Sequence, residues 1–182
     1  QIILEIEKNK KVDVPIVGDL KNVLTELNKE LTQLKHDEWL EKVKGWKKEY
    51  PLVYRKVSDD KLIPQEVLSE LNNILKGNGI VVTDVGQHQM WTAQFMTYTN
   101  PDSIVTSGGA GTMGFGLPAA IGAQVAKPDR KVVLVVGDGG FQMTFQELMM
   151  IKQYNLPVKV LLINNSFLGM VRQWQEIFND RR

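Results

Sequence analysis

The fold is decided by Lys131–Gly140, whose sequence is KVVLVVGDGG. The run before Gly137 is short, unbroken and apolar, with several β-branched residues, which is typical of a strand buried on both faces. Val158–Ile163 has the same character and predicts a second buried strand. Because a helical pattern separates the two runs, we expect a βαβ unit whose strands are parallel and lie next to each other or nearly so.

The helix between these strands has its own start and stop signals. Thr144 and Glu147 have the S/T-x-x-E spacing of a capping box, which predicts that the helix starts at Thr144. Pro157 disfavours the helical conformation at the residue before it, so the helix should end near Asn155.

Polar residues follow both strands. Asp138 comes after the first strand and its glycine, and Asn165 follows the second. Parallel strands about 4.8 Å apart end at one edge of the sheet, where open α/β sheets bind ligands. A carboxylate and an amide oxygen suit Mg²⁺, and Gly139 and Gly140 allow a phosphate to approach the backbone at a helix start. The sequence therefore predicts a magnesium and phosphate site at this edge.

The rest of the chain alternates between strand and helix patterns, which predicts an α/β fold with a parallel sheet flanked by helices. Asp84–Gln89 is expected to be a strand end and Trp91–Tyr98 a helix. The other predicted elements are strands at Ile80–Thr83 and Ile104–Thr106 and helices at Pro64–Lys76 and Leu117–Val125.

The N-terminal part differs from this pattern. We expect residues 1–57 to be the C-terminal tail of a preceding domain plus a helical linker, and residues 58–182 to form the second domain. Gln1–Glu7 is a candidate strand. Leu20–Leu31 and Asp37–Tyr50 carry apolar residues at helical spacing and predict two helices.

Composition excludes several classes of protein. A net charge of +1 gives no electrostatic case for binding nucleic acid or an acidic membrane. The chain has no cysteine, so disulfides and thiolate metal sites are excluded. No apolar run is long enough to span a bilayer, and the cytoplasm is the default location.

The order Gly-Asp-Gly, helix, strand, Asn-Asn resembles the metal and diphosphate signature of enzymes that use thiamine diphosphate, also called thiamine pyrophosphate (TPP). Three further stretches narrow the resemblance: Gly86–Trp91 (GQHQMW), Ser107–Gly114 (SGGAGTMG) and Gly169–Gln175 (GMVRQWQ). Together they resemble the catalytic subunit of the biosynthetic acetohydroxyacid synthase (acetolactate synthase) family, from about Val12 to about Phe178.

This resemblance implies a function. Relatives condense pyruvate, with loss of carbon dioxide, with a second pyruvate or 2-ketobutyrate to give acetolactate or acetohydroxybutyrate, the first common step of branched-chain amino acid biosynthesis. It implies thiamine diphosphate and Mg²⁺ as cofactors and FAD in the full-length enzyme. The implied partners are a homodimer or homotetramer of full-length chains and a regulatory small subunit.

The resemblance also implies roles for individual residues. Asp138, Asn165 and the backbone carbonyl of Phe167 correspond to the metal ligands, and Trp174 to a substrate-channel residue. The implied cofactor-binding residues are Gln87, His88, Gly111, Thr112, Met113, Gly139, Gly140 and Met170.

The chain departs from the family pattern in places. Gly140 stands where relatives usually have serine, so one hydroxyl contact to the diphosphate is expected to be missing. The activating glutamate of relatives belongs to an N-terminal domain, so we expect no catalytic residue in this chain and no activity from it alone. We also expect most of the FAD-binding middle domain and the C-terminal segment that closes over the site to be missing.

Two other functions are open from the residues alone. Gly109–Gly114 has the G-x-G-x-x-G form of a dinucleotide-binding fingerprint, which would make the protein a nicotinamide-dependent dehydrogenase. That function leaves Gln87, His88 and Asn165 without a role. A non-catalytic interaction module would use the large apolar residues around Phe115 and Met143–Ile151, but it leaves the Asp138 and Asn165 pair unexplained.

Overall fold

The computed structural model describes residues 6–55, 58 and 60–182 and divides into two compact units, Gln1–Pro51 and Leu52–Arg182. Most of the candidate strand at Gln1–Glu7 lies outside the described residues. The assignment of residues 1–57 to a preceding domain and its linker stays a prediction.

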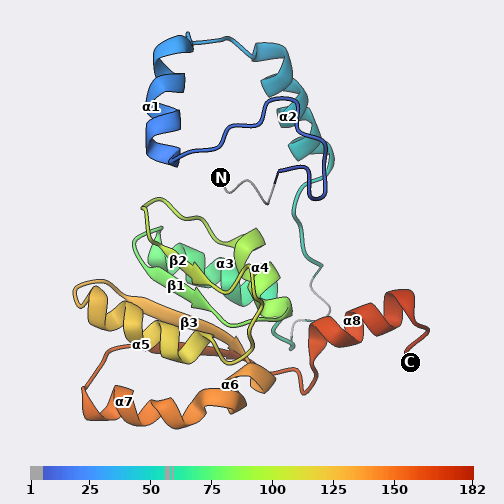
Figure 1. Cartoon of the computed structure of the whole chain (residues 1–182). Coiled ribbons are helices and arrows are strands. Elements are labelled where there is room, and N and C mark those ends of the chain that lie inside the picture. The colour runs from blue at the N-terminus through green and yellow to red at the C-terminus, as the bar shows by residue number, and fades with distance from the viewer. Residues whose placement is uncertain (1–5, 56–57, 59) are drawn as a thin grey trace. The chain divides into compact units, whose positions relative to one another are not determined.

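The first unit contains two helices, α1 (Leu20–Glu30) and α2 (Asp37–Glu49) (Figure 1). Asp19 caps α1 by accepting a hydrogen bond from the backbone N–H of Asn22 at 3.1 Å. Neither helix contains a buried residue, so the apolar faces of both helices stay accessible.

The second unit is built on a four-stranded sheet in the order β2-β1-β3-β4; β1, β2 and β3 are labelled in Figure 1. All three strand pairs are parallel, which confirms the predicted fold class and the predicted βαβ unit. The strands are β1 (Ile80–Thr83), β2 (Ile104–Thr106), β3 (Val132–Gly137) and β4 (Lys159–Ile163).

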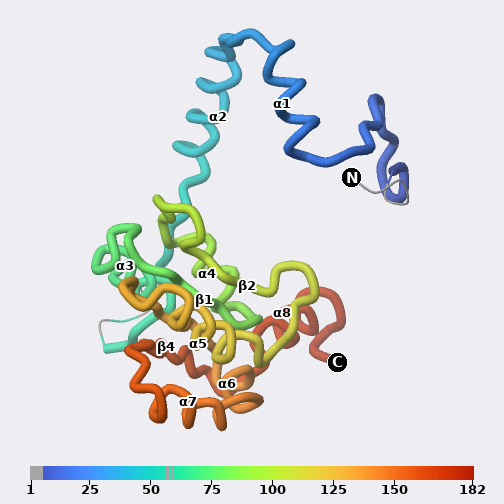
Figure 2. The backbone as a smooth tube through the Cα atoms, turned by 60° about the vertical axis from the view of Figure 1, so that its left-hand side comes forward, coloured from blue at the N-terminus to red at the C-terminus, as the bar shows by residue number. Residues whose placement is uncertain are grey.

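Helices cover the two faces of this sheet. Helices α3 and α4 pack on one face, and α5, α6 and α7 pack on the other (Figure 2). The helices are α3 (Pro64–Leu75), α4 (Gln87–Phe95), α5 (Gly116–Ala126), α6 (Asp138–Thr144), α7 (Leu148–Gln153) and α8 (Gly169–Phe178). No helix in the described parts of the chain is long and apolar enough to cross a membrane.

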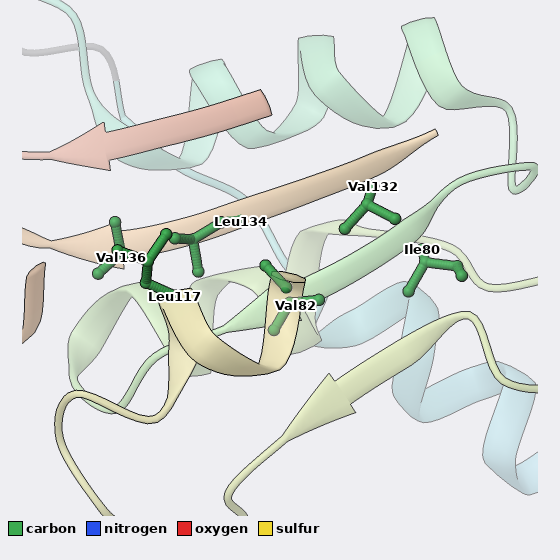
Figure 3. Close-up of a cluster of buried hydrophobic side chains, with 7 residues drawn as sticks. Ile80, Val82, Leu117, Val132, Leu134 and Val136 are labelled. Carbon is green, nitrogen blue, oxygen red and sulfur yellow. The ribbon is translucent and has the colours of Figure 1, made fainter. Parts of the chain in front are cut away.

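Strand β3 lies at the centre of the core. Alternate side chains of a strand point to opposite faces, so Leu134 packs on the α5 side against Leu117, with Val82 of β1 beside it (Figure 3). Val135 points to the other face and packs in the cluster that contains Leu68 of α3. Residues 132–136 are all buried, as predicted for a strand covered on both faces.

The prediction that Val158–Ile163 is a buried strand is wrong in one respect. The strand exists as β4, but among the described strands it pairs only with β3, and Val160 and Leu162 are 38% and 43% exposed. An apolar run does not reveal whether a strand has one neighbour or two.

The predicted capping box is also wrong. The helix begins at Asp138, and Phe145–Glu147 is a short 3₁₀ turn that joins α6 to α7. Thr144 does not cap a helix, because its hydroxyl donates to the carbonyl of Gly114 at 3.1 Å. Likewise Gln87 and His88, expected at a strand end, form the first turn of α4.

We expect Leu134→Ala to destabilise the second unit strongly. Leu134 is fully buried, and removing such a side chain leaves a cavity that lowers the free energy of unfolding by about 2–5 kcal/mol. Urea unfolding followed by circular dichroism measures this change. Leu62→Ala is the matched control, because Leu62 is 82% exposed and its loss should change stability by less than about 0.5 kcal/mol. Equal effects of the two substitutions would contradict the central position of β3.

Candidate functional site

A cavity of about 500 Å³ opens where β1, β3 and β4 end. Its wall includes the residues that directly follow these strands and residues of α8. Of the residues predicted for the site, only Thr112 is absent from this wall. The predicted residues that line the cavity are Gln87, His88, Gly111, Met113, Asp138, Gly139, Gly140, Asn165, Phe167, Met170 and Trp174.

The register of the sheet brings Asp138 and Asn165 to the same side of the cavity. Gly137 pairs with Ile163, so Asp138 lies one residue beyond this pair on its strand and Asn165 two residues beyond it. The side-chain oxygen of Asn165 accepts a hydrogen bond from the backbone N–H of Phe167 at 3.0 Å. This short turn holds Asn165 and the backbone of Phe167 close together.

The described residues form no metal site built only from acidic or imidazole side chains. Among the described residues, no group of three His, Cys, Asp or Glu side chains is placed to hold a metal ion. The predicted set has one carboxylate, one amide and one backbone carbonyl, all hard oxygen donors. Such a set suits Mg²⁺, which takes few protein ligands and completes its shell with water and phosphate oxygens.

His88 is the buried polar group that faces this cavity. Its side chain is 6% exposed, and its Nε2 atom is buried without a hydrogen-bond partner. The ring lies against glycine backbone, since a Cβ added at Gly137 would be 3.1 Å from Nδ1. An unpaired buried polar atom is rare in native proteins, so His88 is a candidate contact for a ligand in this cavity.

Burial lowers the pKa of His88, and the charge of Asp84, a hydrogen bond to the Asp84 backbone and the charge of Asp138 oppose this shift. The imidazole is therefore neutral at pH 7. An anion beside the ring would raise the pKa again, because it favours the protonated form, in which both nitrogens donate.

Two glycines allow side chains to approach closely around the cavity. A Cβ at Gly139 would lie 2.8 Å from the Cδ2 atom of Leu168. A Cβ at Gly169 would collide with Oε1 of Gln87 and would lie 3.1 Å from Nδ2 of Asn165. Gln87, in the first turn of α4, and Asn165, which follows β4, therefore converge beside Gly169.

Helix α8 forms the outer wall. Its Met170 and Trp174 line the cavity, and Trp174 packs against Phe178 with ring centroids 4.8 Å apart. The amide of Gln87 donates to Oε1 of Gln173 at 3.0 Å, which connects α4 to α8.

Sequence reasoning missed two residues of this region. Gln173 lies inside the GMVRQWQ stretch, but the resemblance to the family implies no role for it. Asp84 is fully buried and accepts hydrogen bonds from backbone N–H groups on both of its carboxylate oxygens. The signal for Asp84 was in the sequence, because it directly follows a buried strand, much as Asp138 does after Gly137.

Comparison with known proteins identifies relatives of this chain. Residues 84–182, more than half of the chain, match the family described as thiamine pyrophosphate enzyme, C-terminal TPP binding domain. The acetolactate synthase large subunit of Lactococcus lactis is 49% identical over 98% of this chain. The acetolactate synthase of Mycobacterium bovis is 48% identical over 98% of it, and the mitochondrial acetolactate synthase catalytic subunit of Saccharomyces cerevisiae is 44% identical over 97%.

The chain spans only part of these curated relatives: 31% of the length of the first, 30% of the second and 26% of the third.

The findings do not support the nicotinamide-dependent dehydrogenase considered as the alternative, because the family match includes both glycine-rich turns, at Gly109–Gly114 and at Gly137–Gly140.

We expect the stability of the second unit to fall as the pH drops below about 6.5. The pKa of His88 is lowered in the folded state, so on acidification the unfolded chain binds the proton first. The free energy of unfolding then falls by up to about 1.4 kcal/mol per pH unit. Urea unfolding at pH 7.5, 6.5 and 5.5 measures this slope. His88→Gln should flatten it and His36→Gln, at the other histidine of the chain, should not. The same slope in His88→Gln would show that other groups cause the pH dependence.

Proposed function

This chain belongs to the thiamine pyrophosphate enzyme family, whose C-terminal TPP binding domain it contains, and we propose that its cavity binds the diphosphate end of thiamine diphosphate together with Mg²⁺. The single observation that carries this proposal is His88, which lines the cavity and whose buried Nε2 atom has no hydrogen-bond partner in the protein. A diphosphate oxygen beside this atom would supply the missing hydrogen-bond partner.

The residues around His88 fit this ligand. Gly139 and Gly140 have no Cβ and stand in the first turn of α6, where backbone N–H groups have no partner within the helix and attract an anion. The amide of Gln87, in the first turn of α4, donates one N–H group to Gln173 and has a second one for a phosphate oxygen. The cavity therefore combines neutral and partially positive donors on the side where the diphosphate would lie.

The metal ion would bind at Asp138, Asn165 and the backbone carbonyl of Phe167. Asp138 supplies the one negative charge of this set, and the turn between Asn165 and Phe167 holds the other two donors. The ion would link the protein to the diphosphate oxygens, as hard divalent cations commonly do.

The rest of the cavity wall suits the organic part of the cofactor. Met113 and Met170 line it with apolar surface, and Trp174 lies on the helix that forms the outer wall. When bound, thiamine diphosphate supplies a carbon nucleophile that adds to the carbonyl group of a 2-ketoacid. The residues of this chain would bind and orient the cofactor, and Met113 would contact its organic part.

For the whole protein we propose the activity after which the relatives are named, that of an acetolactate synthase. It would condense pyruvate with pyruvate or 2-ketobutyrate, with loss of carbon dioxide, in branched-chain amino acid biosynthesis. Identity of 44–49% over nearly the whole chain to the three relatives supports this proposal. FAD, a homodimer or homotetramer, a regulatory small subunit and a cytoplasmic location belong to the same proposal.

Titration of the protein with thiamine diphosphate, followed by calorimetry in excess Mg²⁺ and again in EDTA, tests the proposal. We expect binding that requires Mg²⁺, and no comparable binding of NAD. Binding of NAD in place of thiamine diphosphate, or of neither, would overturn it.

Asp138→Ala should weaken this Mg²⁺-dependent binding at least about tenfold, because it removes the only carboxylate of the proposed ligand set. Asp129→Asn is the matched control, since Asp129 is exposed and is absent from the wall of this cavity. Binding by Asp138→Ala that keeps both its strength and its dependence on Mg²⁺ would show that the assigned metal ligand is wrong.

A further inference from the structure

Asp84 is a buried carboxylate to which the proposed function gives no role. It follows β1 directly and is fully buried. Its Oδ1 atom accepts from the N–H groups of Val85 at 2.8 Å and Gly114 at 3.1 Å, and its Oδ2 atom accepts from Gly116 at 2.7 Å. Among the described residues it forms no ion pair, so backbone N–H groups stabilise its charge.

Two of these donors come from one segment: Gly114 lies in the loop that precedes α5, and Gly116 is the first residue of α5. Helix α5 starts at Gly116 without a side-chain cap from its own flanking residue. Asp84, 32 residues earlier in the chain, accepts from the first N–H group of this helix and so takes the place of the missing cap. The same loop carries Met113, which lines the cavity.

The loop is also held from a third element. The hydroxyl of Thr144, the last residue of α6, donates to the carbonyl of Gly114 at 3.1 Å. Gly114 has a φ of +85°, a conformation that favours glycine. Both backbone polar groups of Gly114 are therefore hydrogen-bonded, its N–H group to Asp84 and its carbonyl to Thr144.

Glycines make this arrangement possible by letting the carboxylate approach the backbone. A Cβ at Gly116 would lie 2.9 Å from Cβ of Asp84 and 2.8 Å from Cδ1 of Leu134. A Cβ at Gly140 would collide with Oδ1 of Asp84. The segments that follow β1, β2 and β3 thus meet at one carboxylate.

We propose that Asp84 is a positioning residue, whose buried carboxylate holds Gly114 and Gly116 and thereby places Met113 in the wall of the cavity. In its link to cofactor binding, this inference rests on the proposed function. Asp84 acts through the loop and does not itself contact the cofactor.

Asp84→Asn tests the inference with nearly the same side-chain volume. Both oxygens of Asp84 accept hydrogen bonds, whereas asparagine has only one acceptor oxygen, so the substitution leaves at least one N–H group without a partner. We expect the amide of Gly114 or Gly116 to exchange with solvent at least about tenfold faster relative to the core amides of Val82 and Leu134. Asp129→Asn is the matched control and should leave this ratio unchanged.

A spectroscopic readout follows the loop itself. We expect the ¹³C-methyl resonance of Met113, assigned with Met113→Leu, to shift and broaden in Asp84→Asn. The resonance of Met96, which is 8% exposed and lies in the core cluster on the other face of the sheet, should stay in place. General destabilisation would alter both methionines and all core amides alike, and that result would overturn a positioning role.

A binding measurement tests whether the position of the loop affects cofactor binding. At a temperature where each variant is folded, Asp84→Asn should bind thiamine diphosphate with Mg²⁺ about tenfold more weakly than the unsubstituted protein and Asp129→Asn. Unchanged binding together with an unchanged exchange ratio would overturn the inference. Failure of the unsubstituted protein to bind would overturn the proposed function instead, and exchange and the methionine signals would still decide whether Asp84 places the loop.

Thr144→Val covers the case in which Asp84→Asn does not fold. It removes the hydrogen bond to the carbonyl of Gly114 without changing a buried charge, and Thr144→Ser restores the hydroxyl. We expect the shift of the Met113 signal and the faster exchange at Gly114 to appear in the valine variant and to be reversed in the serine variant. A valine variant with an unperturbed loop would overturn the inference.

Discussion

Strand β3 pairs in parallel with β1 on one side and β4 on the other, and the rest of the second unit depends on this arrangement. Because β3 is buried on both faces, its alternating side chains connect the helices of one layer to those of the other. Parallel pairing also brings the carboxyl ends of all three strands to one edge. The cavity exists because the segments after β1, β3 and β4 leave the sheet at this edge.

Close backbone approach then shapes the cavity. At Gly137, Gly139 and Gly169 a side chain would press on His88, Leu168 or Gln87, so the absence of a Cβ is a spatial requirement at these positions. The resulting wall has apolar surface on one part and amide, imidazole and backbone donors on another. Such a wall can hold a ligand that has an organic part and an anionic part, provided that each polar group finds a partner.

Two buried polar groups of this region, on Asp84 and His88, differ in whether the protein supplies their hydrogen-bond partners. The carboxylate of Asp84 is fully partnered by the protein itself, through N–H groups of two segments. The Nε2 atom of His88 is left without a partner within the same region. The first arrangement holds loops in place in the free protein, and the second leaves one interaction for a ligand, which is why we assign them to positioning and to binding.

The sequence by itself determined the α/β class, the strands of the sheet and the parallel direction of β3 and β4, because short unbroken apolar runs and glycine turns are local signals. It also placed Asp138 and Asn165 at one edge, since parallel pairing follows from a single helical crossover. The tertiary structure alone decided that β4 is an edge strand, that the helix begins at Asp138 and not at Thr144, and that Asp84 caps α5. Each of these depends on contacts between residues far apart in the chain, such as Thr144 with Gly114 and Asp84 with Gly116, which a pattern of neighbouring residues does not reveal.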